Sequence, residues 1–277
     1  MRPSPSIHWS DDLGNSHPAA VPPYRIVCLV PSITELLFDL GLGENLVGRT
    51  GFCIHPAPGV KRVPKVGGTK DVDIEKIRKL QPTHAVVNVD ENPKWVAQAL
   101  EEFVPHVIVT HPLDPTGNLK LYRLFGGVFG RQKQAGALEA QFLEAYQAVI
   151  RGAETLPRQR VLYLIWQNPW MTISRDTYIS RNLALVGWDT MPAEAAARYP
   201  ELPSLSECFD EVDWVLLSSE PYSFREKHLA ELSQALPARS SCRIALVDGE
   251  MASWYGSRAI QGLPYLLRLR HSLEQQE

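Results

Sequence analysis

The chain has 277 residues, of which 44% are hydrophobic and 21% are charged; this composition predicts a water-soluble protein with one large domain or two linked domains. The net charge is -3 and no run of Lys and Arg occurs, so neither nucleic-acid binding nor a polybasic membrane patch is expected. No segment approaches the roughly 20 continuous apolar residues that span a bilayer. We therefore expect a protein that is not embedded in a membrane.

Residues 1–23 are rich in Pro, Ser, His and Asp, and they predict a disordered N-terminal segment. They contain no apolar stretch of about 7–15 residues of the kind found in secretory signals. As written, the chain is therefore expected in the cytoplasm; the alternative is the periplasm, if a signal has been removed. The dispersed cysteines, Cys28, Cys53, Cys208 and Cys242, fit a reducing compartment better than a disulfide framework.

Strands and helices alternate over residues 24–115, which we interpret as an N-terminal α/β lobe. Short apolar runs at 25–30, 46–48, 84–88 and 107–110 predict strands, and residues 35–41, 73–80 and 95–103 predict helices between them. This alternation is typical of βαβ units, which build a mostly parallel sheet.

Residues 116–156 predict a long linking helix, because Leu138, Phe142, Tyr146 and Val149 recur at helical spacing. Glycines at 126, 127 and 130 are expected to break or bend its first part. Residues 157–277 predict a C-terminal α/β lobe, with strands at 160–166, 213–218 and 243–248 and helices at 178–186, 205–209, 227–236 and 257–274. The predicted fold is thus α/β, with two parallel-sheet lobes joined by one long backbone helix. Ligands of open parallel sheets bind at the carboxyl ends of the strands, so a ligand cleft between the lobes is expected.

Several motifs in the first lobe resemble one known family. They are VPSITELLFDLGL at 30–42, LVG at 46–48, VGGT at 66–69 and LQPTHAVV at 80–87. Together they resemble the helical-backbone substrate-binding proteins of ABC importers, which bind vitamin B12 and ferric siderophores. The resemblance covers roughly residues 24–273.

The resemblance implies non-enzymatic binding of a metal chelate (cobalamin or another corrinoid, haem, or a ferric siderophore) and its delivery to an ABC permease. It implies no intrinsic cofactor, and we expect a monomer. The family docks through one surface glutamate per lobe, and Glu75 and Glu207 lie at similar positions. Both glutamates are alternatively solvated carboxylates near helix N-termini, where the helix dipole favours negative charge.

Candidate ligand-binding residues of the first lobe follow the predicted strand ends: Phe52, His55, Thr69, Asn88 and Glu91. By resemblance, Phe52 lies where the B12 binders have a tyrosine, and Thr69 and Asn88 lie where they have tryptophans. These departures put cobalamin itself in doubt. A core phenylalanine and a turn-forming asparagine are the structural alternatives.

In the second lobe, Trp166, Trp170 and Met171 follow a predicted strand, and Trp170 or Met171 matches a family phenylalanine that packs on the ligand. An indole on a loop can stack on a planar ring, although a core tryptophan is the alternative, more so for Trp166 than for Trp170. The segment 220–224, EPYSF, also follows a strand; it either lines the cleft or forms a rigid turn.

The last candidate cluster also follows a strand and comprises Glu250, Trp254, Tyr255 and Arg258. By resemblance, Glu250 and Arg258 correspond to an acid and an arginine that hydrogen-bond the ligand. An arginine fork suits a carboxylate or a phosphate. The structural alternative is a helix start capped by Ser257.

No HxH, HExxH or Cys/His cage occurs, so any metal is expected to arrive already chelated. The GxSxG, Walker and GxGxxG motifs are also absent from the sequence. Two alternatives to a transport protein stay open: a cytoplasmic carrier or sensor of such a chelate, and an enzyme on the related two-lobed fold. A cluster-bearing oxidoreductase would need cysteine ligands, and the dispersed cysteines argue against it.

Overall fold

A computed structural model describes residues 8–237 and 240–275, and these residues form two compact units. Unit 1 contains the chain up to Pro112 together with Thr116–Phe142 and Tyr255–Arg258. Unit 2 contains Leu113–Pro115, Leu143–Trp254 and the chain from Ala259 onward. Within the described part of the chain, every helix is too short or too polar to cross a lipid bilayer.

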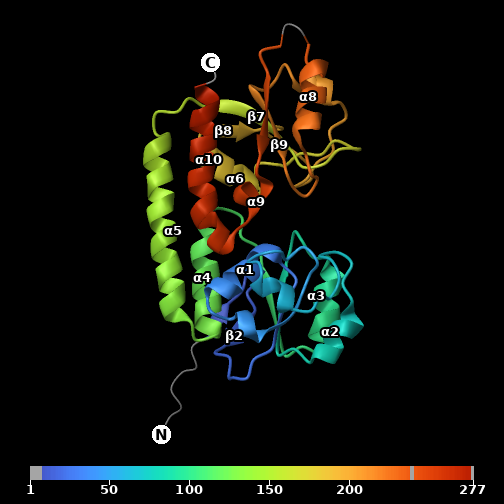
Figure 1. The fold of residues 1–277 in the computed structure, drawn as a ribbon, viewed down its shortest axis with the longest axis vertical. Helices are drawn as coiled ribbons and strands as arrows, with labels where there is room; N and C mark the ends of the chain where they lie inside the picture. The colour runs from blue at the N-terminus through green and yellow to red at the C-terminus, as the bar shows by residue number, and fades with distance from the viewer. Residues whose placement is uncertain (1–7, 238–239, 276–277) are drawn as a thin grey trace. The chain divides into compact units, whose positions relative to one another are not determined.

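Unit 1 is drawn mostly in blue and green in Figure 1. Its core is a four-stranded parallel sheet with the strand order β4-β3-β5-β6. The strands are β3 (Ile26–Cys28), β4 (Leu46–Arg49), β5 (His84–Asn88) and β6 (His106–Thr110). Their aliphatic side chains are buried together with residues of the helices α2 (Ile74–Leu80) and α3 (Lys94–Glu101). The parallel sheet predicted for this half of the chain is confirmed.

Helix α1 (Pro31–Asp39) begins four residues earlier than the sequence predicted, because Pro31 takes the first helical position. Proline suits this position, since its missing N–H would have no partner inside the helix. Two short 3-10 helices, η1 (Gly43–Asn45) and η2 (Gly59–Arg62), flank β4 along the chain. The loop between β4 and η2 is one of the candidate ligand-binding segments.

The N-terminal segment differs from the expectation of disorder over residues 1–23. Residues 1–7 lie outside the described residues, but β1 (His8–Ser10) and β2 (Ser16–Pro18) form an antiparallel hairpin. The hairpin supplies partners to the outer edge of β6: the Asp11 carboxylate accepts from the Val109 N–H at 3.0 Å, and the Asp12 N–H donates to the Val109 carbonyl at 3.0 Å. Composition could not reveal this order, because it depends on an edge strand almost 100 residues away.

The predicted linking helix is two helices, α4 (Gly117–Val128) and α5 (Gln132–Ala153). They are separated at Gly130, whose φ of 64° lies in the left-handed region, so a break occurs at this one of the three glycines. Gly126 and Gly127 lie inside α4 and do not interrupt it. Helix α4 lies within unit 1, whereas α5 contributes residues to both units. Phe142 and Val149 on α5 are buried, as their spacing predicted.

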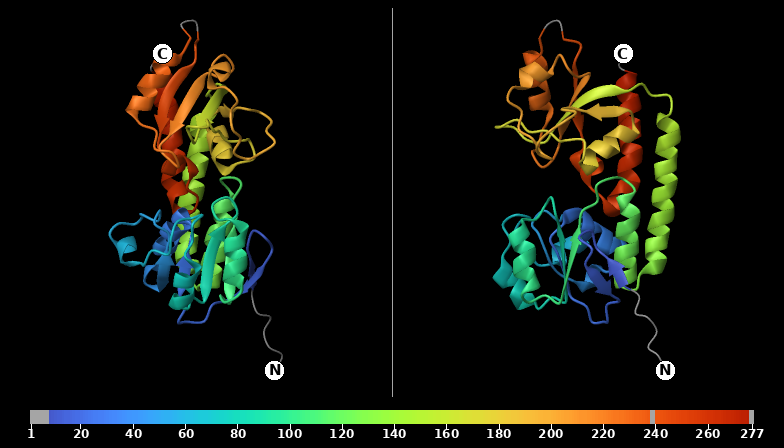
Figure 2. Two further views of the ribbon diagram at one scale, coloured as in Figure 1. Left: turned by 90° about the vertical axis from the view of Figure 1, so that its right-hand side faces the viewer. Right: turned by 180° about the vertical axis from the view of Figure 1, so that it is seen from behind.

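Unit 2 repeats the parallel design with the strand order β10-β9-β7-β8. The strands are β7 (Gln159–Leu164), β8 (Trp188–Thr190), β9 (Trp214–Ser218) and β10 (Arg243–Val247). The helices are α6 (Tyr178–Leu185), α7 (Leu205–Cys208), α8 (Glu226–Ala235), α9 (Gly249–Ser253) and α10 (Ala259–Glu274). Figure 2 shows helices lying against the sheet in each unit. The sequence missed β8, because three residues are too few to show an alternating pattern.

A four-residue segment also changes the expected connectivity. Tyr255–Arg258, which includes the 3-10 helix η3 (Gly256–Arg258), belongs to unit 1, although the residues on either side of it belong to unit 2. The sequence suggested that a single long helix connects the two units. The chain also passes from unit 2 to unit 1 and back at Tyr255–Arg258, so α5 is not the sole connection.

Candidate functional site

The loop after β4 in unit 1 exposes one of the predicted aromatic residues. The Phe52 side chain is 63% exposed, so it is not the core phenylalanine that the sequence left as an alternative. His55, in the same loop, is half-buried and lies close enough to Glu35 to act on its charge. An exposed aromatic ring directly after a parallel strand is available to an apolar ligand surface.

Arg49, at the end of β4, determines the shape of this loop. Its buried guanidinium donates to the carbonyls of Val60 at 2.8 Å and of Thr50 and Cys53 at 3.0 Å each. Each of these bonds links a charged donor to a neutral acceptor, which makes it stronger than an ordinary amide hydrogen bond. This role of Arg49 is not evident from the sequence, because it depends on the return of the chain at η2.

Asn88, at the end of β5, stabilises a turn with its side chain, which was the structural alternative to a ligand contact. Its Oδ1 atom accepts from the N–H groups of Asp90 at 2.8 Å and Glu91 at 3.2 Å, and its side chain is buried. Thr69 is half-buried, and its carbonyl accepts from the Asn92 side chain at 2.8 Å. Asn88 therefore shapes the loop that carries Glu91, and Glu91 in turn accepts a hydrogen bond from the Tyr255 hydroxyl.

The segment 255–258 is held in unit 1 by polar contacts that the sequence did not predict. The Gly256 N–H donates to Asn118 Oδ1 at 2.6 Å, and the Tyr122 hydroxyl donates to the Gly256 carbonyl at 2.9 Å. Gly256 has a φ of 78°, and a Cβ here would lie 3.2 Å from Leu36, so both conformation and space favour glycine.

Arg258 forms an ion pair with Glu35 of α1. Its Nε donates to Oε2 at 2.9 Å and its Nη2 donates to Oε1 at 2.7 Å, and the two side chains are only 11% and 15% exposed. Burial raises the pKa of Glu35, while the charges of Arg258 and His55 oppose this rise. The charge of the guanidinium is thus largely neutralised by Glu35. No local pattern indicates this pairing, because the two residues are 223 positions apart in the chain.

Aromatic residues gather after the strands β7 and β9 in unit 2. Trp166 is 40% exposed and contacts Tyr222 edge to face, with ring centroids 5.6 Å apart. Trp170 is half-buried and stacks on Phe224 with an interplanar angle of 4°. From the sequence, Trp170 was expected to be the more exposed of the two indoles, and Trp166 was the one for which a core position was the stronger alternative. In the structure Trp166 is the more exposed residue.

Tyr222 connects the two loops; from the sequence alone, its segment 220–224 was expected either to line the cleft or to form a turn. Its hydroxyl donates to Gln167 Oε1 at 2.9 Å and lies 3.4 Å from His228 Nε2. Met171 is half-buried and is held by backbone bridges to Trp166 and Glu201. The segment 220–224 therefore supports the loop that bears Trp166.

The cluster after β10 contacts the carboxyl group of Glu220, which belongs to the segment 220–224 after β9. Trp254 is 8% exposed, and its indole N–H donates to Glu220 Oε1 at 2.5 Å. Glu250 is half-buried and close enough to raise the pKa of Glu220. Burial is the main reason why that pKa rises to about 7.

The two predicted docking glutamates are both exposed. Glu75 lies in the first turn of α2 with a 73% exposed side chain and is 3.5 Å from Arg78. Glu207 lies in the short helix α7 and is also exposed. Each position fits either a docking contact or a solvated carboxylate near a helix N-terminus.

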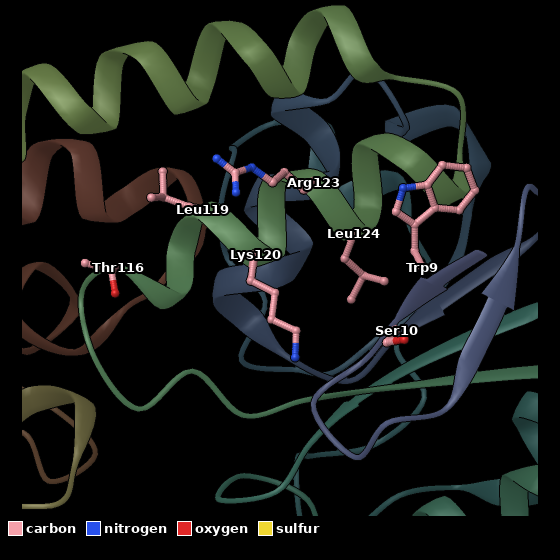
Figure 3. Close-up of a pocket in the computed structure, with 7 residues that line it drawn as sticks. All are labelled: Trp9, Ser10, Thr116, Leu119, Lys120, Arg123 and Leu124. Atoms are coloured by element: carbon pink, nitrogen blue, oxygen red, sulfur yellow. The ribbon is translucent and has the colours of Figure 1, made fainter. Parts of the chain in front are cut away.

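Among the described residues, neither a metal-binding cluster nor the pocket in Figure 3 involves the candidate residues. No group of three or more His, Cys, Asp or Glu within them is arranged to hold a metal ion. A pocket of about 330 Å³ in unit 1 contains none of the predicted residues (Figure 3). It is lined by Trp9, Ser10, Thr116, Leu119, Lys120, Arg123 and Leu124.

Solved structures of binding proteins share this fold. The chain superposes on the periplasmic vitamin B12 binding protein of Vibrio cholerae with a TM-score of 0.77 and 18% identity, covering 90% of this chain and 98% of that one. The apo periplasmic haem-binding protein of Roseiflexus sp. RS-1 gives a TM-score of 0.77 and 23% identity, with the same coverage of both chains.

Sequence comparison points the same way. A vitamin B12-binding protein of Vibrio vulnificus (strain CMCP6) is 24% identical over 186 residues, which are 66% of this chain and 67% of that protein. An uncharacterised ABC transporter substrate-binding lipoprotein of Bacillus subtilis (strain 168) is 25% identical over 64% of this chain and 61% of that protein. Residues 26–234 match the family described as "Periplasmic binding protein", a family of binding proteins and not of enzymes. This match spans more than half of the chain, which therefore belongs to the periplasmic binding protein family.

Proposed function

We propose that the chain binds a metal chelate (a corrinoid, haem or a ferric siderophore) without chemical change and serves an ABC importer. The observation that carries this proposal is the exposure of Phe52 and Trp166 at the carboxyl ends of parallel strands. Large aromatic rings at these positions suit the flat, partly apolar surface of a macrocyclic ligand. The relatives that are named for vitamin B12 or haem support the choice of ligand class.

We propose that each unit contributes ligand contacts of its own. In unit 1 these are Phe52, His55, Thr69 and Glu91, with Asn88 and Arg258 acting mainly by shaping their loops. In unit 2 they are Trp166, Met171 and Glu250, whereas Trp170 and Trp254 act mainly by packing. Tyr255 holds Glu91 in place through its hydroxyl.

A titration of the purified chain tests the ligand class. Cyanocobalamin, haemin and a ferric siderophore are added in turn, and binding is followed by the visible spectrum of the ligand and by tryptophan fluorescence. We expect saturable binding of at least one of them. If none of the three binds, the chain does not recognise a metal chelate of these classes.

A pair of tryptophan variants tests the location. Trp166→Ala should weaken binding roughly tenfold, because the loss of a stacking contact of about 1.4 kcal/mol corresponds to that factor. Trp95→Ala is the matched control, since Trp95 lies on α3 and is 49% exposed, compared with 40% for Trp166. Equal effects of the two substitutions would refute a role for the Trp166 loop in binding.

We also propose that the chain functions in the periplasm, which was the alternative to the cytoplasmic location expected from residues 1–23. Several solved relatives are described as periplasmic and one curated relative as a lipoprotein, which favours this alternative. Cell fractionation tests it, and recovery of the native protein only in the cytoplasmic fraction would contradict it.

The permease remains the proposed partner, with Glu75 and Glu207 as the proposed docking residues. Reversing both charges with Glu75→Arg and Glu207→Arg should abolish chelate uptake and leave chelate affinity unchanged. Glu44→Arg is the control, because Glu44 on η1 is also an exposed glutamate, with a 90% exposed side chain. Normal uptake by the double variant would show that the two glutamates are only solvated surface charges.

A further inference from the structure

Glu220 lies two residues after the end of β9 in unit 2, and its carboxyl group is partly buried without a cationic partner among the described residues. Its Oε1 atom accepts two hydrogen bonds, from Trp254 Nε1 at 2.5 Å and from Ser253 Oγ at 3.3 Å. Among the described residues, no partner reaches Oε2, the second carboxyl oxygen, and no cation pairs with the group. Half of the hydrogen-bonding capacity of this side chain is therefore unused within the protein.

The backbone of α9 makes room for this carboxyl group. A Cβ at Gly249 would lie 2.6 Å from Glu220 Cγ and 2.6 Å from Ser218 Oγ, so a larger residue at position 249 would displace the glutamate. The Gly249 N–H donates to Ser219 Oγ at 2.8 Å, which ties the start of α9 to the end of β9. The carboxyl group thus occupies a fitted position at the carboxyl edge of the sheet, where ligands of parallel sheets bind.

The groups that face Glu220 are acidic or neutral. Glu250 on α9 and Asp248 just before α9 both raise its pKa, and Tyr163 on β7 is close enough to interact with it electrically. Burial is the larger cause, and the total effect raises the pKa of Glu220 to about 7. Because Trp254 and Ser253 both donate to Oε1, the proton belongs on Oε2, which then becomes a donor.

We propose that Glu220 determines ligand specificity, by donating a hydrogen bond from its protonated carboxyl group to an uncharged amide carbonyl on the rim of the ligand. A ligand carboxylate is disfavoured at this position, because Asp248 and Glu250 lie beside it and like charges repel. The ligand class is thereby narrowed to an amide-bearing chelate such as a corrinoid, in preference to a propionate-bearing haem. This inference rests on the proposed function.

Binding of cyanocobalamin to the whole chain is measured between pH 5.5 and 8.5 for the wild type, Glu220→Gln and Glu220→Leu. Wild-type affinity should fall about tenfold from pH 6 to pH 8, because a group with a pKa near 7 loses most of its protons over that range. Glu220→Gln should keep the high affinity at every pH, since its amide N–H₂ replaces the acidic donor. Glu220→Leu should bind weakly throughout.

Glu226→Gln is the matched control, because Glu226 begins α8 in the same unit and its side chain is exposed. This variant should keep the wild-type pH profile. Circular dichroism and thermal unfolding establish that each variant is folded, so a weak affinity of Glu220→Leu is not the result of unfolding.

Several outcomes overturn the inference. One is an affinity of the wild type that rises with pH; another is a Glu220→Gln variant that keeps the wild-type pH profile. Haemin binding at least as tightly as cyanocobalamin would overturn the choice of an amide-bearing ligand. The absence of binding by any chelate to the wild type at every pH would refute the proposed function and this inference with it.

Discussion

The ion pair between Arg258 and Glu35 allows a quantitative test of how the segment 255–258 is held. Replacing Arg258 by Met removes two hydrogen bonds, of 2.9 and 2.7 Å, from a carboxylate that is only 15% exposed. Breaking a fully buried pair from one side costs about 3–5 kcal/mol, because it leaves an uncompensated charge. Since Glu35 keeps some solvent contact and can take up a proton, we expect Arg258→Met to reduce the free energy of unfolding by about 2–4 kcal/mol.

Urea denaturation of a double-mutant cycle measures this effect. Arg258→Met, Glu35→Gln and the double variant are compared with the wild type at pH 7. The double variant should lose less than the sum of the single variants, with a coupling energy of at least about 1.5 kcal/mol, as is typical of contacting charges. The exposed pair of Arg62 and Glu44, at 3.4 Å, is the matched control and should couple by less than about 1 kcal/mol.

The reasoning fails if the two cycles give the same coupling energy. It also fails if Arg258→Met keeps wild-type stability and loses only chelate binding. That result would mean that the guanidinium serves the ligand and that its pairing with Glu35 contributes little to the fold.

Three further predictions concern unit 1. Arg49→Met should destabilise the chain by roughly 3–5 kcal/mol, because several buried carbonyls lose a charged donor; a urea-measured loss below about 1 kcal/mol would contradict this. Burial lowers the pKa of His84 to about 4 in the folded chain, so on acidification the unfolded chain binds this proton first. The free energy of unfolding should therefore fall by up to about 3 kcal/mol as the pH drops from about 6.5 to 4. A His84→Gln variant should lose this part of the pH dependence, and an unchanged profile would refute the assignment. Gly127→Ala should destabilise the chain by roughly 1–3 kcal/mol, since its Cβ would lie 2.0 Å from Trp9 Nε1. In a Trp9→Ala background the same change should be stabilising by up to about 1 kcal/mol, because alanine favours helix more than glycine does; thermal unfolding that shows the same sign in both backgrounds would contradict the predicted clash.

Local patterns predicted most of the architecture. Apolar runs at 84–88 and 213–218 became central strands, and Gly130 marked the break between α4 and α5. These signals are local, because hydrophobic periodicity and glycine conformation depend on a few neighbouring residues. The N-terminal hairpin escaped prediction, since its order depends on Asp11 and Asp12 meeting the edge of β6.

The candidate residues divide in the same way. Which residues follow the strand ends was evident from the sequence, and so was the family resemblance that the comparisons confirmed. The degree of exposure was not evident: Trp166 and Trp170 lie four residues apart on one loop, yet Trp166 is 40% exposed and Trp170 is half-buried.

The sequence by itself determined the two parallel sheets, the long helix α5 and the loops on which a ligand would be sought. Only the tertiary structure decided that Arg258 meets Glu35, that Asn88 shapes its own loop and that the partly buried Glu220 accepts a hydrogen bond from Trp254. The physical reason is that burial and ion pairing depend on residues far apart in the chain, and these residues come together only when the sheets and helices pack.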